Sequence, residues 1–161
     1  MTDVTESTNV VSSTGDQTSV TIEPILQLAK KCEISQLDLE NVISINENNV
    51  DIVCIIEGSE LEQMIIGSLI LLLAYEIALK QEWAPSSILL ENLKKIGVQD
   101  RGRNFSTYMK NRSDLFLINS AKKGYRLTTN KGRKIAAKII QKLSKREKIA
   151  KDDLTDTQSQ S

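Results

Sequence analysis

One apolar run of sixteen residues constrains the fold of this chain more than any other feature of its sequence. Residues 64–79 read MIIGSLILLLAYEIAL, in which Glu76 is the one charged residue and Gly67 and Ser68 are small interruptions. A membrane span needs about 20 consecutive apolar residues, so this run predicts no membrane segment. Because the run is apolar nearly all round, we expect a buried helix over 60–82 that contacts more than one neighbour.

The composition fits one compact domain and excludes several kinds of chemistry. The 161 residues are 40% apolar but only 4% aromatic, which indicates an aliphatic core. The chain has no histidine, which excludes Ser-His and Cys-His catalysis and histidine-ligated zinc. Its two cysteines, Cys32 and Cys54, stand among apolar residues, as core cysteines of a reducing compartment do. With no glycine-rich phosphate loop and no cluster of metal ligands, we expect no enzyme, no cofactor and no metal. The start of the chain has no secretion signal, so we expect a cytoplasmic protein.

The zero net charge conceals a strong division along the chain. Residues 1–84 hold three basic and fourteen acidic residues, whereas residues 85–150 hold seventeen basic and four acidic ones. The first segment therefore has a net charge of −11 and the second a net charge of +13. A basic half favours a polyanionic partner, of which nucleic acid is the commonest, although a solvated lysine-rich surface has the same composition.

The first part of the chain predicts a small unit that packs on the rest. Residues 1–21 read as a disordered leader and residues 149–161 as a disordered tail, because both are polar and without a period. Residues 22–57 predict a short helix over 22–31 and a hairpin of two strands, 41–45 and 50–56. A helix and a hairpin of this size are not stable alone, so we expect them to cover the remaining domain.

The second part, 58–148, predicts the order helix, helix, helix, hairpin, helix. After the central helix we expect a helix over 88–96, a helix over 103–111, strands over 115–118 and 125–128, and a long last helix. Ser86 or Ser87 is expected to cap the second helix, Gly97 to end it, and Thr128 or Thr129 to cap the last one. The expected fold is mainly α with a small β component (α+β), a winged helix-turn-helix preceded by a short helix and a β-hairpin.

The helix expected over 103–111 has two chemically different sides. Phe105, Tyr108 and Met109 share one side, and a polar set shares the other, with no acidic residue between Arg101 and Arg112. An ordinary amphipathic helix has the same pattern, but the missing acids favour DNA. The candidate recognition residues are Arg103, Asn104, Ser106, Thr107 and Lys110. The candidate phosphate and wing contacts are Arg101, Arg112, Lys122, Lys123 and Arg126.

Residues 64–143 resemble the winged-helix regulators of bacteria and archaea, of the broad MarR-like and PadR-like sort. The most specific stretch is GYRLTTNKGR at 124–133, which is similar to the Y-x-L-T-x-x-G signature at the entry to the last helix. In that signature Tyr125 and Leu127 enter the core, Thr128 caps the helix and Gly132 allows close packing. The resemblance implies that 103–110 is the recognition helix and 119–124 the wing tip. It does not extend to residues 22–57, and the link 97–103 is longer than the usual tight turn.

These features predict a transcriptional regulator that binds double-stranded DNA. The runner-up is a winged-helix protein-interaction module within a larger assembly, in which the basic helix from Arg133 to Lys148 binds an acidic protein. We also expect a homodimer, because palindromic sites need two readers and because the apolar helix 60–82 exceeds what a small domain needs.

Overall fold

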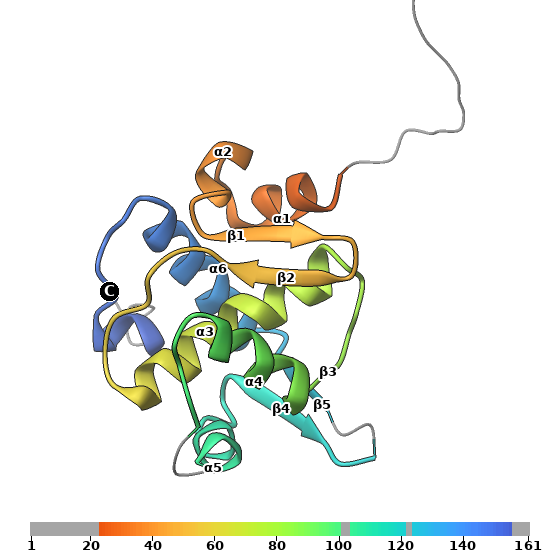
Figure 1. The fold of residues 1–161 in the computed structure, drawn as a ribbon, viewed down its shortest axis with the longest axis vertical. Helices are drawn as coiled ribbons and strands as arrows, with labels where there is room; N and C mark the ends of the chain where they lie inside the picture. The colour runs from red at the N-terminus through yellow and green to blue at the C-terminus, as the bar shows by residue number, and fades with distance from the viewer. Residues whose placement is uncertain (1–22, 101–103, 122–123, 156–161) are drawn as a thin grey trace, which may run out of the picture.

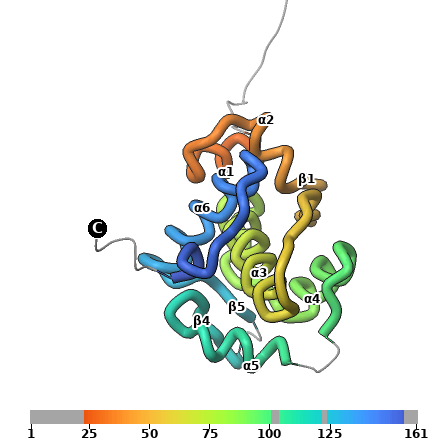
Figure 2. Tube along the Cα trace, turned by 90° about the vertical axis from the view of Figure 1, so that its left-hand side faces the viewer, coloured from red at the N-terminus to blue at the C-terminus, as the bar shows by residue number. Residues whose placement is uncertain are grey.

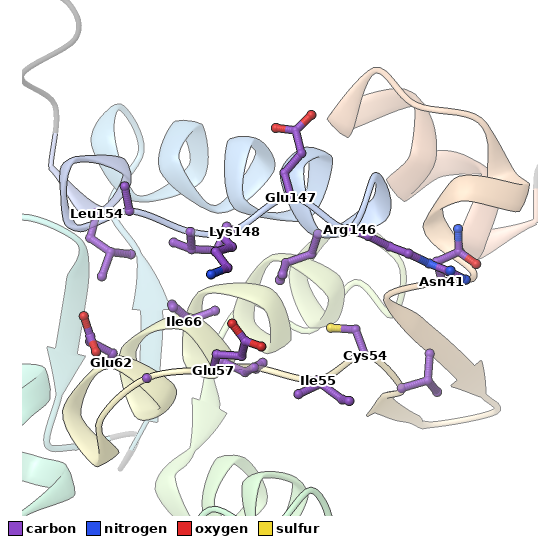
Figure 3. Close-up of a pocket in the computed structure, with 16 residues that line it drawn as sticks. Asn41, Cys54, Ile55, Glu57, Glu62, Ile66, Arg146, Glu147, Lys148 and Leu154 are labelled. Atoms are coloured by element: carbon purple, nitrogen blue, oxygen red, sulfur yellow. The ribbon is translucent and has the colours of Figure 1, made fainter.

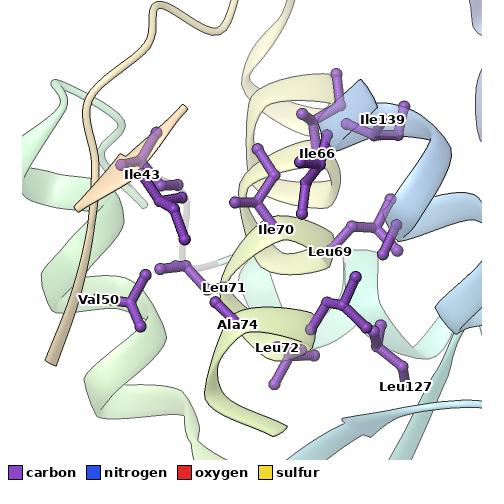
Figure 4. Packing of buried hydrophobic residues seen from close by; sticks show 14 of the residues in the cluster. Ile43, Val50, Ile66, Leu69, Ile70, Leu71, Leu72, Ala74, Leu127 and Ile139 are labelled. Atoms are coloured by element: carbon purple, nitrogen blue, oxygen red, sulfur yellow. The ribbon is translucent and has the colours of Figure 1, made fainter. Parts of the chain in front are cut away.

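The computed structural model describes residues 23–100, 104–121 and 124–155, and helix α3 (Glu60–Ile77) runs through their centre (Figure 1). Every residue of α3 from Met64 to Tyr75 is buried. The helix contacts α1, α4, α5, α6, β2 and β5, which explains why its sequence is apolar all round. Figure 4 shows its leucine and isoleucine side chains between the hairpin residues Ile43 and Val50 on one side and Ile139 on the other. The predicted central buried helix is confirmed.

The ends of α3 are set by local chemistry. Ser59 and Glu62 form a capping box, in which the Ser59 hydroxyl accepts from the Glu62 N–H at 3.2 Å and Glu62 accepts from the Ser59 N–H at 2.9 Å. At the other end the helix stops at Ile77 and not at 82 as predicted. The chain turns there through Lys80, which has a left-handed φ of 57°. The chain itself covers the apolar surface of α3, so this helix leaves no surplus apolar surface for a dimer contact.

The elements before α3 include a helix and a β-hairpin that pack on α3. Helix α1 (Pro24–Cys32) contacts α3 and α6, and strands β1 (Ile43–Asn46) and β2 (Asn49–Ile52) pair antiparallel, with Ile43 opposite Ile52. The predicted second strand ends four residues early, but its alternation continues, since Ile56 is buried and Ile55 is exposed. The short helix α2 (Gln36–Leu39) was not predicted because four residues show no helical period.

A three-stranded sheet joins segments that the sequence keeps apart. Its order is β3-β5-β4, with β3 (Ala84–Pro85), β4 (Phe116–Asn119) and β5 (Gly124–Leu127) all antiparallel. The pairing of Ala84 with Tyr125 makes a strand where the sequence predicted only a break. Pro85 is compatible with this role because β3 is an edge strand, where a missing N–H leaves no ladder bond broken.

Two helices follow β3. Helix α4 (Ser86–Lys95) begins directly after the strand, and no side chain caps it, so the predicted serine cap is wrong. The predicted stop is confirmed, since Gly97 has a φ of +90° and the Val98 N–H donates to the Leu93 carbonyl at 3.0 Å. Helix α5 (Phe105–Lys110) then begins two residues later than predicted.

The last helix, α6 (Lys131–Ser144), packs closely on the wing strands. The N-cap of α6 is Asn130, which makes no side-chain cap bond, and not Thr128 or Thr129 as predicted. The Thr128 hydroxyl nevertheless accepts from the Gly132 N–H in the first turn of the helix at 2.7 Å. A Cβ at Gly132 would overlap the Leu115 carbonyl oxygen, so the predicted close packing at this glycine is present. Beyond α6 the prediction of a disordered tail from 149 is wrong for 149–155. A 3-10 turn, η2 (Lys151–Leu154), packs on α6, and it buries Asp153 and Leu154.

A buried polar cluster fixes the hairpin to the helices. The Tyr75 hydroxyl donates to the Asn49 side chain at 2.9 Å and accepts from the Asn92 amide at 3.0 Å. Asn92 is 2% exposed and also donates to the Ile88 carbonyl at 3.1 Å. The cluster therefore joins β2, α3 and α4 through directional bonds in a region that is otherwise aliphatic.

Candidate nucleic-acid interface

Helix α5 is held in the molecule by its apolar side. Phe105 and Met109 are buried, and the Phe105 ring meets the Tyr125 ring edge-on, with centroids 5.6 Å apart and planes at 78°. The Asp100 carboxylate accepts from the N–H groups of Asn104 at 2.6 Å and Phe105 at 3.2 Å. This acid therefore fixes the start of α5, a role that the sequence analysis missed.

The opposite side of α5 carries three of the predicted recognition residues together. Ser106, Thr107 and Lys110 are exposed, which matches the pattern of sides expected from their spacing. Asn104 is half-buried, and its amide nitrogen lies 3.5 Å from the Tyr108 hydroxyl. Arg103 lies outside the described residues. In Figure 1 and Figure 2 α5 lies at the end of the molecule opposite α1 and α2.

Arg112 follows α5 and is committed to neighbours within the chain. Its guanidinium donates to both oxygens of Asp114, at 3.1 and 3.0 Å, and to the Leu154 carbonyl. The Lys131 ammonium also pairs with Asp114 at 2.9 Å. Burial raises the pKa of Asp114, but the hydrogen bonds from Arg112 and Lys131 outweigh it and hold that pKa at about 2. The predicted phosphate contact is thus one side of a structural ion pair, and the spacing of Arg112 and Asp114 could have indicated it.

Arg126 on β5 is also paired. Its guanidinium forms an ion pair with Glu82 and lies over the Trp83 ring, 5.5 Å from its centre. The side chain is 17% exposed. Glu82 is far away in the sequence, so no local pattern could have found this pair. The other predicted phosphate and wing residues, Arg101, Lys122 and Lys123, lie outside the described residues.

The remaining exposed cations gather mainly at the end of α1 and along α6 and the segment after it. Within the described ranges, each of these side chains lacks an ion-pair partner. They are Lys30, Lys31, Lys80, Lys94, Lys110, Lys134, Lys145, Arg146, Lys148 and Lys151.

A groove of about 700 Å³ lies between the segment after β2 and the segment after α6 (Figure 3). Its walls are largely aliphatic, and Ile55 on its rim is 83% exposed. Cys54 lines this groove, whereas Cys32 lies in the core. Burial raises the pKa of the Cys32 thiol to about 12 and that of Cys54 to about 11, so neither thiol is a reactive thiolate at neutral pH.

Glu76 shows how the structure uses the acid in the central apolar run. Its carboxylate pairs with the Arg133 guanidinium of α6, and the two side chains are 15% and 24% exposed. The pair ties α3 to α6 at the edge of the core, so the one acid of the apolar run has a structural partner.

No helix of the described residues is both long and apolar enough to cross a membrane. The same residues contain no group of three or more potential metal-ligating His, Cys, Asp or Glu side chains. Comparison of the chain with protein-family models, with curated proteins and with solved structures finds no match.

Proposed function

We propose that this chain binds double-stranded DNA through α5 and acts as a winged-helix transcriptional regulator. The observation that carries the proposal is the two-sided character of α5. Phe105 and Met109 anchor one side in the core, while Ser106, Thr107 and Lys110 stand exposed on the other. Hydroxyl and ammonium groups on a firmly packed helix are suited to base edges in the major groove and to phosphates.

The order of the elements supports the same proposal. The run from α3 to α6 is helix, strand, helix, helix, hairpin, helix, with β3 paired to the second hairpin strand. This order is the one expected of a winged helix-turn-helix, in which the second short helix reads the major groove and the hairpin flanks it. The contacts of Tyr125, Thr128 and Gly132 agree with the signature that the sequence resembles.

The proposed contacts are not all equally available. Ser106, Thr107 and Lys110 are exposed, whereas Arg103 lies outside the described residues and is a candidate from the sequence alone. To bind DNA, Arg112 and Arg126 would each have to give up an ion pair with a carboxylate for one with a phosphate. We therefore assign both a structural role: Arg112 stabilises the connection between α5 and β4, and Arg126 stabilises the β4–β5 hairpin. Since many sites for such readers are palindromic, a homodimer belongs to this proposal.

The test compares Thr107→Ala/Lys110→Ala with the matched control Lys94→Ala, another exposed lysine without an ion pair among the described residues. Fluorescence anisotropy measures binding to a short random-sequence duplex over a salt series. We expect the double variant to bind about tenfold more weakly and its salt slope to fall by about 0.9, because one phosphate contact is lost. Circular dichroism should give an unchanged melting temperature. Equal affinities of wild type and double variant would refute the assignment of α5.

The second candidate function is a protein-interaction module. It is favoured by Leu117 and Ile118, each 43% exposed on β4, which is an edge strand of its sheet. The same titration decides between the two candidates. If the wild type binds no duplex even at low salt, the DNA proposal fails and an acidic protein partner becomes the better explanation of the basic half.

A further inference from the structure

A second groove, of about 770 Å³, lies between the end of α1 and the outer side of α6. Five of its lining residues are cationic and one is acidic: Lys31, Lys131, Arg133, Lys134, Lys138 and Glu33. We call it the α6 groove. The Gln141 amide of α6 donates to the Cys32 carbonyl at 2.6 Å, which fixes the end of α1 against α6 and so fixes the two walls of the groove.

Three of the five cations are free or nearly free to bind a ligand. Lys31 and Lys134 are exposed and form no ion pair with any described residue. Lys138 lies 3.9 Å from an oxygen of Asp153, but that carboxylate is already held by Lys142 at 2.9 Å. The other two cations are engaged, since Lys131 pairs with Asp114 and Arg133 with Glu76.

The arrangement of these charges suits a linear polyanion. Lys134 and Lys138 are spaced i and i+4 along α6, so they share one face and lie about 6 Å apart along the helix. Each strand of a duplex carries one phosphate per roughly 3.4 Å of helix axis, so the two ammonium groups can contact phosphates of the same strand. Among the lining residues that the structure describes, Ala137 is the one aliphatic side chain, so the groove offers little to an apolar ligand.

We propose that the α6 groove is a second binding site for nucleic-acid phosphates, separate from α5. The wall formed by α1 lies toward the end of the molecule that is opposite α5 (Figure 1). The protein then contacts nucleic acid over two surfaces, of which the α6 groove contributes charge and no base recognition. This inference goes beyond the proposed function and does not depend on the role of α5.

The test measures the salt dependence of duplex binding in Lys134→Gln/Lys138→Gln. Its matched control is Lys94→Gln/Lys151→Gln, which removes two exposed lysines that do not line the groove. Loss of two phosphate contacts should lower the slope of log affinity against log salt by about 1.8, whereas the control slope should stay unchanged. Lys31→Gln, on the opposite wall, should lower it by about 0.9. Urea unfolding of each variant verifies that the fold is retained.

The outcomes separate this inference from the proposed function. If the salt dependence of duplex binding falls in the groove variants while the α5 variant binds like the wild type, the α6 groove is supported as a binding site and the assignment of α5 fails. If the α5 variant alone loses affinity, the groove inference is overturned. It is also overturned if polyglutamate binding depends on Lys134 and Lys138 while duplex binding does not, because the groove is then a site for acidic protein.

Discussion

Asn92 provides the sharpest test of how the hairpin is held to the helical part of the molecule. Its side chain bonds to the Tyr75 hydroxyl at 3.0 Å, to the Ile88 carbonyl at 3.1 Å and to Asn49 at 3.3 Å. At 2% exposure, water cannot replace these bonds without opening the structure. Each buried hydrogen bond contributes about 1 kcal/mol net, so Asn92→Ala should lower the free energy of unfolding by about 3 kcal/mol.

This loss is large because a domain of this size is stable by only about 5–15 kcal/mol. Urea denaturation followed by circular dichroism measures it as a shift of the midpoint by roughly 1.5 M at constant m. The control is Glu91→Ala, the exposed neighbour on α4, which should change the free energy by less than about 0.5 kcal/mol. Tyr75→Phe completes a double-mutant cycle, with an expected coupling of about 1 kcal/mol. A loss below about 1 kcal/mol in Asn92→Ala, or additivity in the cycle, would refute the cluster as a stabilising unit.

Two further predictions follow from the glycine contacts and from Asp114. Gly132→Ala should lower the free energy of unfolding by about 2 kcal/mol, which is more than Gly67→Ala should. The new Cβ at position 132 would overlap the fixed Leu115 carbonyl oxygen, whereas a Cβ at position 67 would meet the movable end of the Leu93 side chain. Equal losses in thermal unfolding would contradict this reasoning. The pKa of Asp114 is about 2 in the folded state, below its unfolded value of about 3.9. The ionised carboxylate therefore contributes fully to the free energy of unfolding above pH 4, and this contribution is lost as the pH falls toward 2. Asp114→Asn should therefore show a weaker dependence of unfolding free energy on pH between 4 and 2, and an unchanged dependence would exclude the ion pair as its cause.

Local sequence patterns were sufficient to predict the main helices and strands. The apolar run of α3, the alternation through Val50 and Ile56, and the stop at Gly97 depend on near neighbours, so they are visible in one sequence. The two sides of α5 are predictable for the same reason, because the helical period alone places Phe105 opposite Ser106 and Thr107. The packing role of Gly132 was predicted from the Y-x-L-T-x-x-G signature that the chain resembles.

Contacts between distant segments decided the rest. Ala84 and Pro85 become a strand only because Tyr125 and Gly124 lie beside them, and two residues carry no period of their own. The pairing of Arg126 with Glu82 joins residues 44 apart in the sequence, and it turns a predicted phosphate contact into a structural one.

The sequence by itself therefore determined the longer helices, the two hairpins and which half of the chain is basic. Only the tertiary structure decided which cations are neutralised and which remain exposed on α5 and in the α6 groove. The physical reason is that secondary structure follows from bonds and spacings within a few residues, whereas the availability of a charge depends on the side chains that folding brings around it.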